Sequence, residues 1–188
     1  MICIGGSQGS IAPLSELLSG LPRHFSPSIL ITLHRHTEST ETLLHMLHAE
    51  GHPALIEPYD KDRLSDGAVY LAPPDYHLLV NDGWLSLNCD PPVQYSRPSI
   101  DVMLQSVALT CGGDVLVIIL SGANSDGAEG AQSLHRRGAE IWVQAPEEAE
   151  AETMPRATLE RVPSAKRLTI DEMAQRLRSL LNTEGEAR

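Results

Sequence analysis

The most constraining feature of the sequence is an unbroken apolar run at residues 115–120, Val-Leu-Val-Ile-Ile-Leu. Because the run is apolar on both faces and rich in β-branched residues, it predicts a central strand covered by helices on both sides. Strand-like and helix-like segments alternate around it, at 2–4, 12–21, 29–33, 41–51, 114–120, 127–138, 140–143 and 171–181. This alternation predicts an α/β domain with a mainly parallel sheet.

Residues 53–95 interrupt the alternation. Turn residues recur every few positions there, and no helical period is visible. Within this stretch, an Asp-Gly pair at 82–83 is flanked by apolar residues, which is a strong hairpin signal. We therefore expect an antiparallel β insertion over 53–95, followed by a helix with Ser99 as its N-cap.

Length and charge limit the classes of function. A chain of 188 residues supports one substantial core, and we expect a single domain over 1–182 with a polar tail at 183–188. We expect the acidic stretch 146–152 to be a solvated helix face. The net charge of -11 disfavours binding to nucleic-acid phosphates. No apolar run is long enough to insert in a membrane.

Cysteine usage indicates the compartment. The three cysteines, Cys3, Cys89 and Cys111, are odd in number and form no CxxC pair. This pattern is typical of a reducing environment and not of a disulfide scaffold. The N-terminus also lacks the features of a signal peptide, so we predict a cytoplasmic protein.

The glycine-rich turn Gly-Gly-Ser-Gln-Gly at 5–9 follows the first strand-like run. It lacks the lysine of a P-loop, and its glycines have the wrong spacing for a dinucleotide fingerprint. The pattern Gly5-x-Ser7-x-Gly9 between a strand and a helix instead fits a nucleophile elbow, in which the serine hydroxyl is exposed at the sheet edge. The alternative is a tight turn in which Ser7 only caps the next helix.

A nucleophilic serine needs a base and a group that orients the base. Sites in open parallel sheets lie at the carboxyl ends of strands, where His34 and Asp126 follow two strand-like runs. We therefore expect Ser7, His34 and Asp126 to meet at one edge. His36 is an alternative base on the same loop, and Asp126 could instead be a helix N-cap. Asp101 is explained as a carboxylate in the first turn of a helix.

A metal site is a separate reading of the histidines. Five of them lie within nineteen positions: His34, His36, His45, His48 and His52. Three imidazoles can bind zinc, but the sequence has neither an HExxH nor a CxxC motif. We therefore expect no metal, and we explain the last three histidines as a polar helix face.

The sequence closely resembles the catalytic domain of CheB-type chemotaxis methylesterases from about residue 2 to about residue 160. Six separated blocks carry the resemblance in the family order: "IGGSQGSIAPL", "ITLHRH", "YLAPPDYHLLV", "SRPSIDVMLQSVA", "GDVLVIILSGANSDGAEG" and "TMPRATLE". The resemblance implies a doubly wound, Rossmann-like three-layer αβα fold with an antiparallel hairpin. It also implies a triad with Ser7 as nucleophile, His34 as base and Asp126 as the orienting acid.

The implied function is that of a serine hydrolase without metal or organic cofactor. Such an enzyme demethylates glutamyl methyl esters on the cytoplasmic domain of methyl-accepting chemoreceptors, and can deamidate glutamines. A receptor methyltransferase or a separate receiver protein are further implied partners. Two alternatives stay open: an esterase with a changed substrate, and a catalytically weak docking module.

The chain also departs from the family pattern. Gln8 and Ser10 replace a usual threonine and glycine, Leu33 and Arg35 flank the histidine, and Ala123 stands near the expected oxyanion. Gln-Ala-Pro at 144–146 replaces a usual Gln-Asp. We expect these changes to alter the pocket wall, with backbone N–H groups near Gln8 and in the loop 121–125 holding the oxyanion. Typical members also carry an N-terminal receiver domain, so we expect a stand-alone or excised catalytic domain, or different regulation.

Overall fold

The structure is a computed structural model that describes residues 1–35, 55–111 and 114–185. Its main sheet has seven strands in the order β3-β4-β2-β1-β7-β8-β9, and every pairing in it is parallel. The strands are β1 (Ile2–Gly6), β2 (Ile29–Leu33), β3 (Leu55–Ile56), β4 (Val69–Leu71), β7 (Leu116–Ile119), β8 (Glu140–Gln144) and β9 (Lys166–Leu168). The expected parallel α/β sheet is therefore confirmed.

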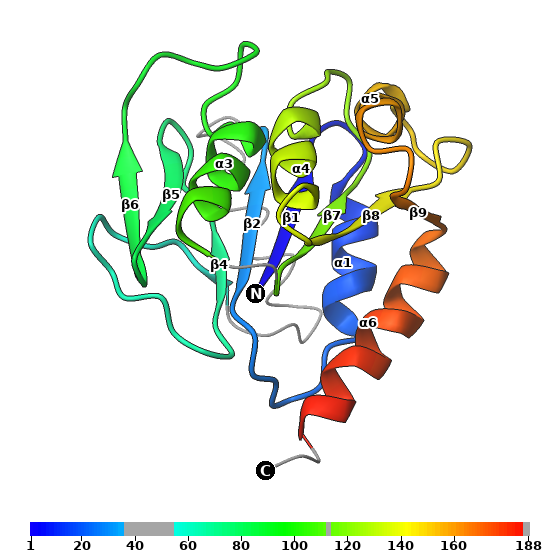
Figure 1. The fold of residues 1–188 in the computed structure, drawn as a ribbon, viewed down its shortest axis with the longest axis horizontal. Coiled ribbons are helices and arrows are strands. Elements are labelled where there is room, and N and C mark those ends of the chain that lie inside the picture. Colours follow the sequence, from blue (N-terminus) through cyan, green and yellow to red (C-terminus); the bar gives the residue numbers. More distant parts are fainter. Residues whose placement is uncertain (36–54, 112–113, 186–188) are drawn as a thin grey trace.

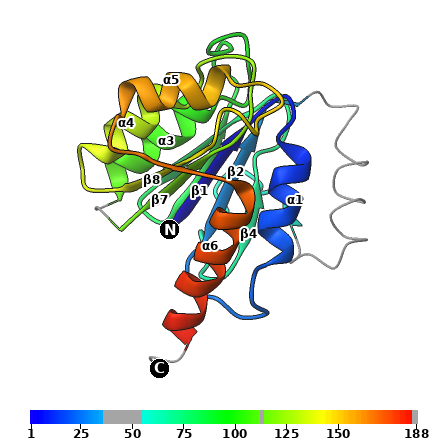
Figure 2. The same ribbon diagram turned by 90° about the vertical axis from the view of Figure 1, so that its right-hand side faces the viewer.

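Helices cover both faces of this sheet, giving three layers (Figure 2). One face carries α1 (Ile11–Ser19) and α6 (Ile170–Gly185), and the other carries α3 (Ile100–Thr110), α4 (Ala128–His135) and α5 (Thr153–Arg161). Helix α6 continues past residue 182, where we expect the domain to end. The doubly wound, three-layer prediction is confirmed.

The central strands show why the fold has two cores. In β7, Leu116 and Ile118 pack on the α1 and α6 side, whereas Val117 and Ile119 pack on the α3 and α4 side. All four side chains are buried. A strand that is buried on both faces has a continuous apolar sequence. The apolar run at 115–120 therefore predicted this strand correctly.

The prediction of an antiparallel insertion over 53–95 is only partly right. Strands β3 and β4 extend the parallel sheet beside β2. Among the described residues, the antiparallel strand pair is β5 (His77–Asn81) with β6 (Trp84–Asn88), accompanied by isolated antiparallel bridges at Arg63–Trp84 and Val93–Ser96. The turn of this hairpin is Asp82-Gly83, as predicted. The frequent turn residues marked where the chain reverses, but strand direction is set by long-range pairing, which the pattern does not contain.

The acidic stretch 146–152 is not the solvated helix face that we expect from the sequence. It forms turns before α5 begins at Thr153. Glu148 accepts a hydrogen bond from the N–H of Ile170 (2.9 Å) at the start of α6, and the N–H of Ala151 donates to Ser121 Oγ (2.9 Å). These long-range contacts hold the segment together with local turn bonds, such as the one from Ala149 N to Ala145 O (3.2 Å).

The carboxyl ends of the central strands lie at one edge of the sheet, which Figure 1 shows above the start of β1. Backbone hydrogen bonds join the residues that leave this edge. The N–H of His34 donates to Gly6 O (3.1 Å), and the N–H of Ser7 donates to Ser121 O (2.9 Å). The segments that follow β1, β2 and β7 are thereby held side by side.

Candidate active site

Ser7 lies in a tight turn immediately after β1. Ser121 Oγ donates to Gln8 O (2.7 Å), so the turn is fixed to the segment after β7. The left-handed conformation falls on Gly9, with a φ of +75°, and a Cβ there would lie 2.4 Å from Glu150 Cβ. A Cβ at Gly5 would lie 2.5 Å from Ile100 Cγ2. Both glycines are therefore needed for the close packing of this turn.

Ser7 is not the cap of the helix that follows it. The N-cap residue of α1 is Ser10, and its side chain makes no capping hydrogen bond. The Ser10 hydroxyl instead donates to the carbonyl of Ser7 (2.6 Å). The capping alternative is therefore wrong, and the half-buried Ser7 side chain lines a cavity.

His34 and Asp126 form a hydrogen-bonded pair. His34 Nε2 lies 2.7 Å from Asp126 Oδ2, with side-chain exposures of 10% and 0%. An ionised carboxylate only accepts hydrogen bonds, so the proton of the neutral imidazole lies on Nε2. The remaining nitrogen, Nδ1, is then an acceptor. Among the described residues, no hydrogen bond joins the Ser7 hydroxyl to the ring, and such bonds commonly tighten only with substrate bound.

The Asp126 carboxylate also caps a helix, although not the one that it precedes. Gly127 is the N-cap of α4, whereas Asp126 accepts hydrogen bonds at the start of α3. Its Oδ1 accepts from Ser99 Oγ (2.9 Å) and Asp101 N (2.9 Å), and its Oδ2 accepts from Ile100 N (2.7 Å). Both oxygens are therefore fully used. Asp126 therefore does cap a helix, as the sequence allowed, but the helix is α3 and not α4, which directly follows it.

The surroundings of Asp126 favour the ionised carboxylate. Burial opposes ionisation, but the hydrogen bonds from His34, Asp101 N and Ile100 N outweigh it and lower the pKa of Asp126 below its ordinary value. Its neighbour Asp101 behaves differently, because burial raises the pKa of that carboxyl to about 6. Asp101 accepts from Gly130 N (2.8 Å) on α4 and from Gln94 Nε2 (3.2 Å).

A cavity of about 530 Å³ opens over Ser7 and His34. Its walls come from the segments after β1, β2, β4, β6 and β7: Ser7, Gln8, His34, Arg35, Asp75, Pro92, Gln94, Tyr95, Ser96, Arg97, Ala123 and Asn124. Among the described residues, the N–H groups of Gln8 and Ala123 donate no hydrogen bond. Both are therefore available to a ligand in this cavity.

The departures from the family pattern have different positions. Gln8, Arg35 and Ala123 line the cavity, as expected for residues of a pocket wall. Arg35 is held there by an ion pair with Glu57 and a hydrogen bond to Ala72 O (2.8 Å).

The other departures do not form the cavity wall. Ser10 and Leu33 are buried, and Leu33 packs in the core beneath α1. In Gln-Ala-Pro at 144–146, the residue that differs from the usual Gln-Asp is Ala145, which is also buried. For these three residues the prediction of an altered pocket wall is wrong, because their side chains pack inward from the sheet edge.

A residue that the sequence analysis missed is His77 at the start of β5. It is 1% exposed, its Nδ1 accepts from Ser99 N (3.1 Å), and its Nε2 bonds Pro91 O (3.2 Å). It therefore supports both the start of α3 and a loop of the cavity wall. Ser99 is the N-cap that we expect, accepting from Val102 N. No local pattern marks His77, because its partners are distant in sequence.

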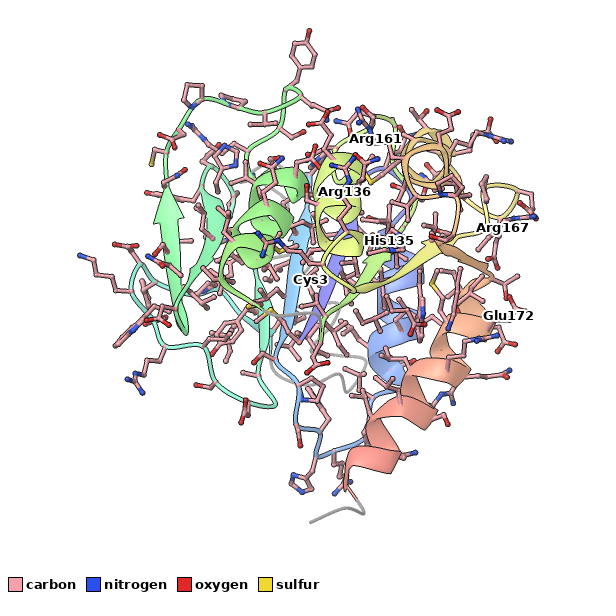
Figure 3. The ribbon with its side chains drawn as sticks, viewed as in Figure 1. Cys3, His135, Arg136, Arg161, Arg167 and Glu172 are labelled. Carbon is pink, nitrogen blue, oxygen red and sulfur yellow. The ribbon has the colours of Figure 1, made fainter. Side chains whose placement is uncertain are left out.

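Other candidate groups do not contribute to this site. Cys3 is enclosed by the fold (Figure 3), and burial raises the pKa of its thiol to about 12. The alternative base His36 and the histidines 45, 48 and 52 lie outside the described residues. Within 1–35, 55–111 and 114–185, no three metal-binding side chains form a group. No described helix is long and apolar enough to cross a bilayer.

The chain is similar in sequence to known proteins. The sequence profile of the family described as CheB methylesterase matches residues 2–177. A relative from Leptospira interrogans (strain Fiocruz L1-130) is 34% identical over 175 residues, covering 93% of this chain and 91% of the relative. The protein-glutamate methylesterase/protein-glutamine glutaminase 1 of Saccharophagus degradans is 32% identical, and the match covers 94% of this chain and 49% of that protein.

The fold also matches a solved structure. The crystal structure of the CheB methylesterase catalytic domain of Thermotoga maritima superposes with a TM-score of 0.87 at 25% sequence identity. The match covers 95% of this chain and 97% of that domain. The seven-stranded sheet and the small antiparallel pair therefore form an arrangement known from a CheB catalytic domain.

Proposed function

Because the chain belongs to the CheB methylesterase family, we propose that it hydrolyses glutamyl methyl esters on the cytoplasmic domain of chemoreceptors. The same acyl transfer would deamidate glutamines, in keeping with the names of its relatives. The observation that carries the proposal is the buried pair of His34 and Asp126, joined at 2.7 Å beside the cavity that contains Ser7.

In the first half of the proposed reaction, Ser7 Oγ attacks the ester carbonyl and transfers its proton to His34 Nδ1. Asp126 keeps the other ring proton on Nε2 and stabilises the imidazolium that forms. The tetrahedral intermediate then collapses. His34 returns the proton to the methoxy oxygen, methanol leaves, and the glutamyl group stays bound to Ser7 as an acyl ester.

In the second half, water enters the position that methanol has left. His34 removes one water proton as the hydroxyl attacks the acyl carbon, and it then protonates Ser7 Oγ as the C–O bond breaks. The product is the free glutamate side chain. For a glutamine substrate the leaving group is ammonia, and the other steps are the same.

The negative oxygen of each intermediate needs hydrogen-bond donors that are already in place. Gln8 and Ala123 belong to the cavity wall, and among the described residues their N–H groups have no acceptor, so we assign them this role. Loss of one such donor typically costs about 3 kcal/mol of transition-state stabilisation. Because backbone groups supply the donors, the change to Gln8 is compatible with an intact oxyanion site.

The test is Ser7→Ala, assayed by methanol release from a purified, methylated chemoreceptor cytoplasmic domain. We expect release to fall to the background rate while the unfolding temperature stays near that of the wild type. Ser164→Ala is the matched control, because Ser164 Oγ lies 2.9 Å from a histidine nitrogen, His135 Nε2, outside the cavity. His135 is the last residue of α4 (Figure 3) and does not belong to the cavity wall.

A serine-directed phosphonate gives a second readout that needs no receptor. We expect it to label the wild type and Ser164→Ala, and to leave Ser7→Ala unlabelled. Substantial methanol release by Ser7→Ala would refute Ser7 as the nucleophile. Labelling without methanol release from the receptor would support the triad but refute the proposed substrate.

A further inference from the structure

The connection between β6 and α3 contains a very short hairpin at residues 93–96. Val93 N donates to Ser96 O (3.1 Å), and Ser96 N donates to Val93 O (2.9 Å). The two central residues, Gln94 and Tyr95, both have positive φ, at 46° and 66°. Two-residue turns with positive φ at both positions strongly favour Asn-Gly or Asp-Gly, so Gln-Tyr is an unfavourable pair here.

The same chain shows what a turn of this kind uses when only chain reversal is needed. The β5–β6 hairpin turns at Asp82 and Gly83, with φ values of 47° and 80°. These are the residues that such a turn prefers. A bulky residue in the left-handed region is an energetic outlier, and outliers of this kind are a reason to look for function. The position of Tyr95 is therefore the feature to explain.

Side-chain hydrogen bonds hold the unfavourable turn in place. Gln94 Nε2 donates to Asp101 Oδ2 (3.2 Å), Ser125 Oγ donates to Gln94 Oε1 (2.7 Å), and Asn124 Nδ2 donates to Gln94 O (3.2 Å). The turn is thus fixed to α3 and to the loop that carries Asp126. These hydrogen bonds of Gln94 therefore fix the position of the neighbouring Tyr95 relative to Ser7, His34 and Asp126.

The Tyr95 side chain is not buried by any other part of the described structure. It is fully exposed, yet it belongs to the wall of the cavity that contains Ser7 and His34. The connection that carries it rises beside the carboxyl ends of the strands (Figure 1). Tyrosine combines a large apolar surface with little side-chain entropy to lose, and it is enriched among residues that dominate binding.

We propose that Tyr95 is a specificity-determining residue that packs against the polypeptide of the protein substrate, beside the glutamyl side chain that enters the cavity. A glutamyl ester reaches Ser7 through a flexible side chain, so the chain that carries it must lie outside, at the rim. Tyr95 stands at that rim. This inference rests on the proposed function, because it assumes that a protein-bound ester is the substrate.

The test compares two substrates. Methanol release from the methylated receptor domain and hydrolysis of p-nitrophenyl acetate each give a kcat/KM, and their ratio isolates recognition of the polypeptide. We expect Tyr95→Gly to lower this ratio about tenfold and, because glycine suits the left-handed conformation, to raise the Tm by about 2 °C. Tyr95→Phe keeps the ring and should keep the ratio within about twofold.

Tyr59→Ala is the matched control, since Tyr59 is 80% exposed and does not line the cavity. An unchanged ratio in Tyr95→Gly, or a fall equal to that of Tyr59→Ala, overturns the role of Tyr95. A lower ratio accompanied by a lower Tm also overturns it, because Tyr95 would then support the fold. A wild type that cleaves p-nitrophenyl acetate but releases no methanol overturns the proposed substrate, and this role with it.

Discussion

Asp126→Asn tests the claim that one carboxylate serves both the helix and the base. In the wild type, Asp126 accepts four hydrogen bonds, from His34, Ser99 Oγ and the N–H groups of Ile100 and Asp101. Asparagine replaces one accepting oxygen by an NH₂ group. In either orientation that group faces the N–H of Ile100 or the N–H of Asp101, and neither backbone donor can turn away. At least one buried hydrogen bond is therefore lost.

The size of the effect follows from this arrangement. Removing an acceptor so that a buried donor is left unpaired costs about 1–3 kcal/mol, and more where a charged group made the bond. We therefore expect Asp126→Asn to lower the free energy of unfolding by about 3 kcal/mol. For a domain of this size, each kcal/mol changes the Tm by about 2–4 °C. The Tm should fall by roughly 6–12 °C, which calorimetry measures directly.

The loss of kcat/KM in Asp126→Asn should exceed the loss that its lower stability alone would cause. If the new NH₂ faces His34, Nε2 must accept its hydrogen bond and the ring proton moves to Nδ1, which then cannot take the proton of Ser7. If it faces away, the imidazolium loses its stabilising charge. The wrong tautomer at a serine triad costs about 10⁴-fold in kcat, and a lost general-base contribution about 10²-fold. We expect kcat/KM to fall between these limits.

Asp101→Asn is the matched control. Asp101 is also buried and lies beside Asp126, but it bonds Gly130 N and Gln94. The rise of its pKa from 3.8 to about 6 corresponds to about 3 kcal/mol of disfavoured ionisation, so its neutral replacement should raise the Tm at pH 7. Equal losses of Tm in the two variants, or Asp126→Asn activity within tenfold of wild type, would refute the reasoning.

Two further predictions use the surroundings of the pair. Because the pKa of Asp101 is raised to about 6, the folded protein binds more protons than the unfolded chain between about pH 4 and 6. The stability that Asp101 contributes should therefore be present below about pH 4 and be lost as the pH rises through about 6. The Tm of the wild type should fall over this range, and the Tm of Asp101→Asn should not show this fall. Separately, His77→Gln keeps a donor for Pro91 O and loses the acceptor for Ser99 N, so we expect about tenfold lower kcat as the start of α3 loosens beneath Asp126. His77→Asn keeps that acceptor and should retain kcat; equal kcat values in the two variants would contradict this assignment.

The sequence predicted those parts of the fold whose signals are local. Residues 115–120 are apolar on both faces, and β7 is buried on both faces. The Asp-Gly pair marked the β5–β6 turn, and Ser99 caps α3. In each case the physical cause, either hydrophobic burial or backbone conformation, acts over a few neighbouring residues, so a short stretch of sequence contains the whole signal.

The parts that could not be predicted depend on distant partners. The direction of β4 is set by its pairing with β2, and the turns at 146–152 are held by bonds to Ser121 and Ile170. At the site, the strand-end rule brought His34 near Asp126. However, the link from Asp126 to α3 and the support by His77 join residues that only tertiary packing brings together.

The double use of Asp126 has a consequence for inactive relatives of this domain. A descendant that lost Ser7 and His34 would still need an acceptor for the first N–H groups of α3, because those donors lie in the interior. Selection for a stable fold would then retain the acid after selection for hydrolysis had ended. An aspartate at this position therefore indicates the fold and not the activity. Only the serine and the histidine beside it would distinguish a hydrolase from an inactive protein with the same fold.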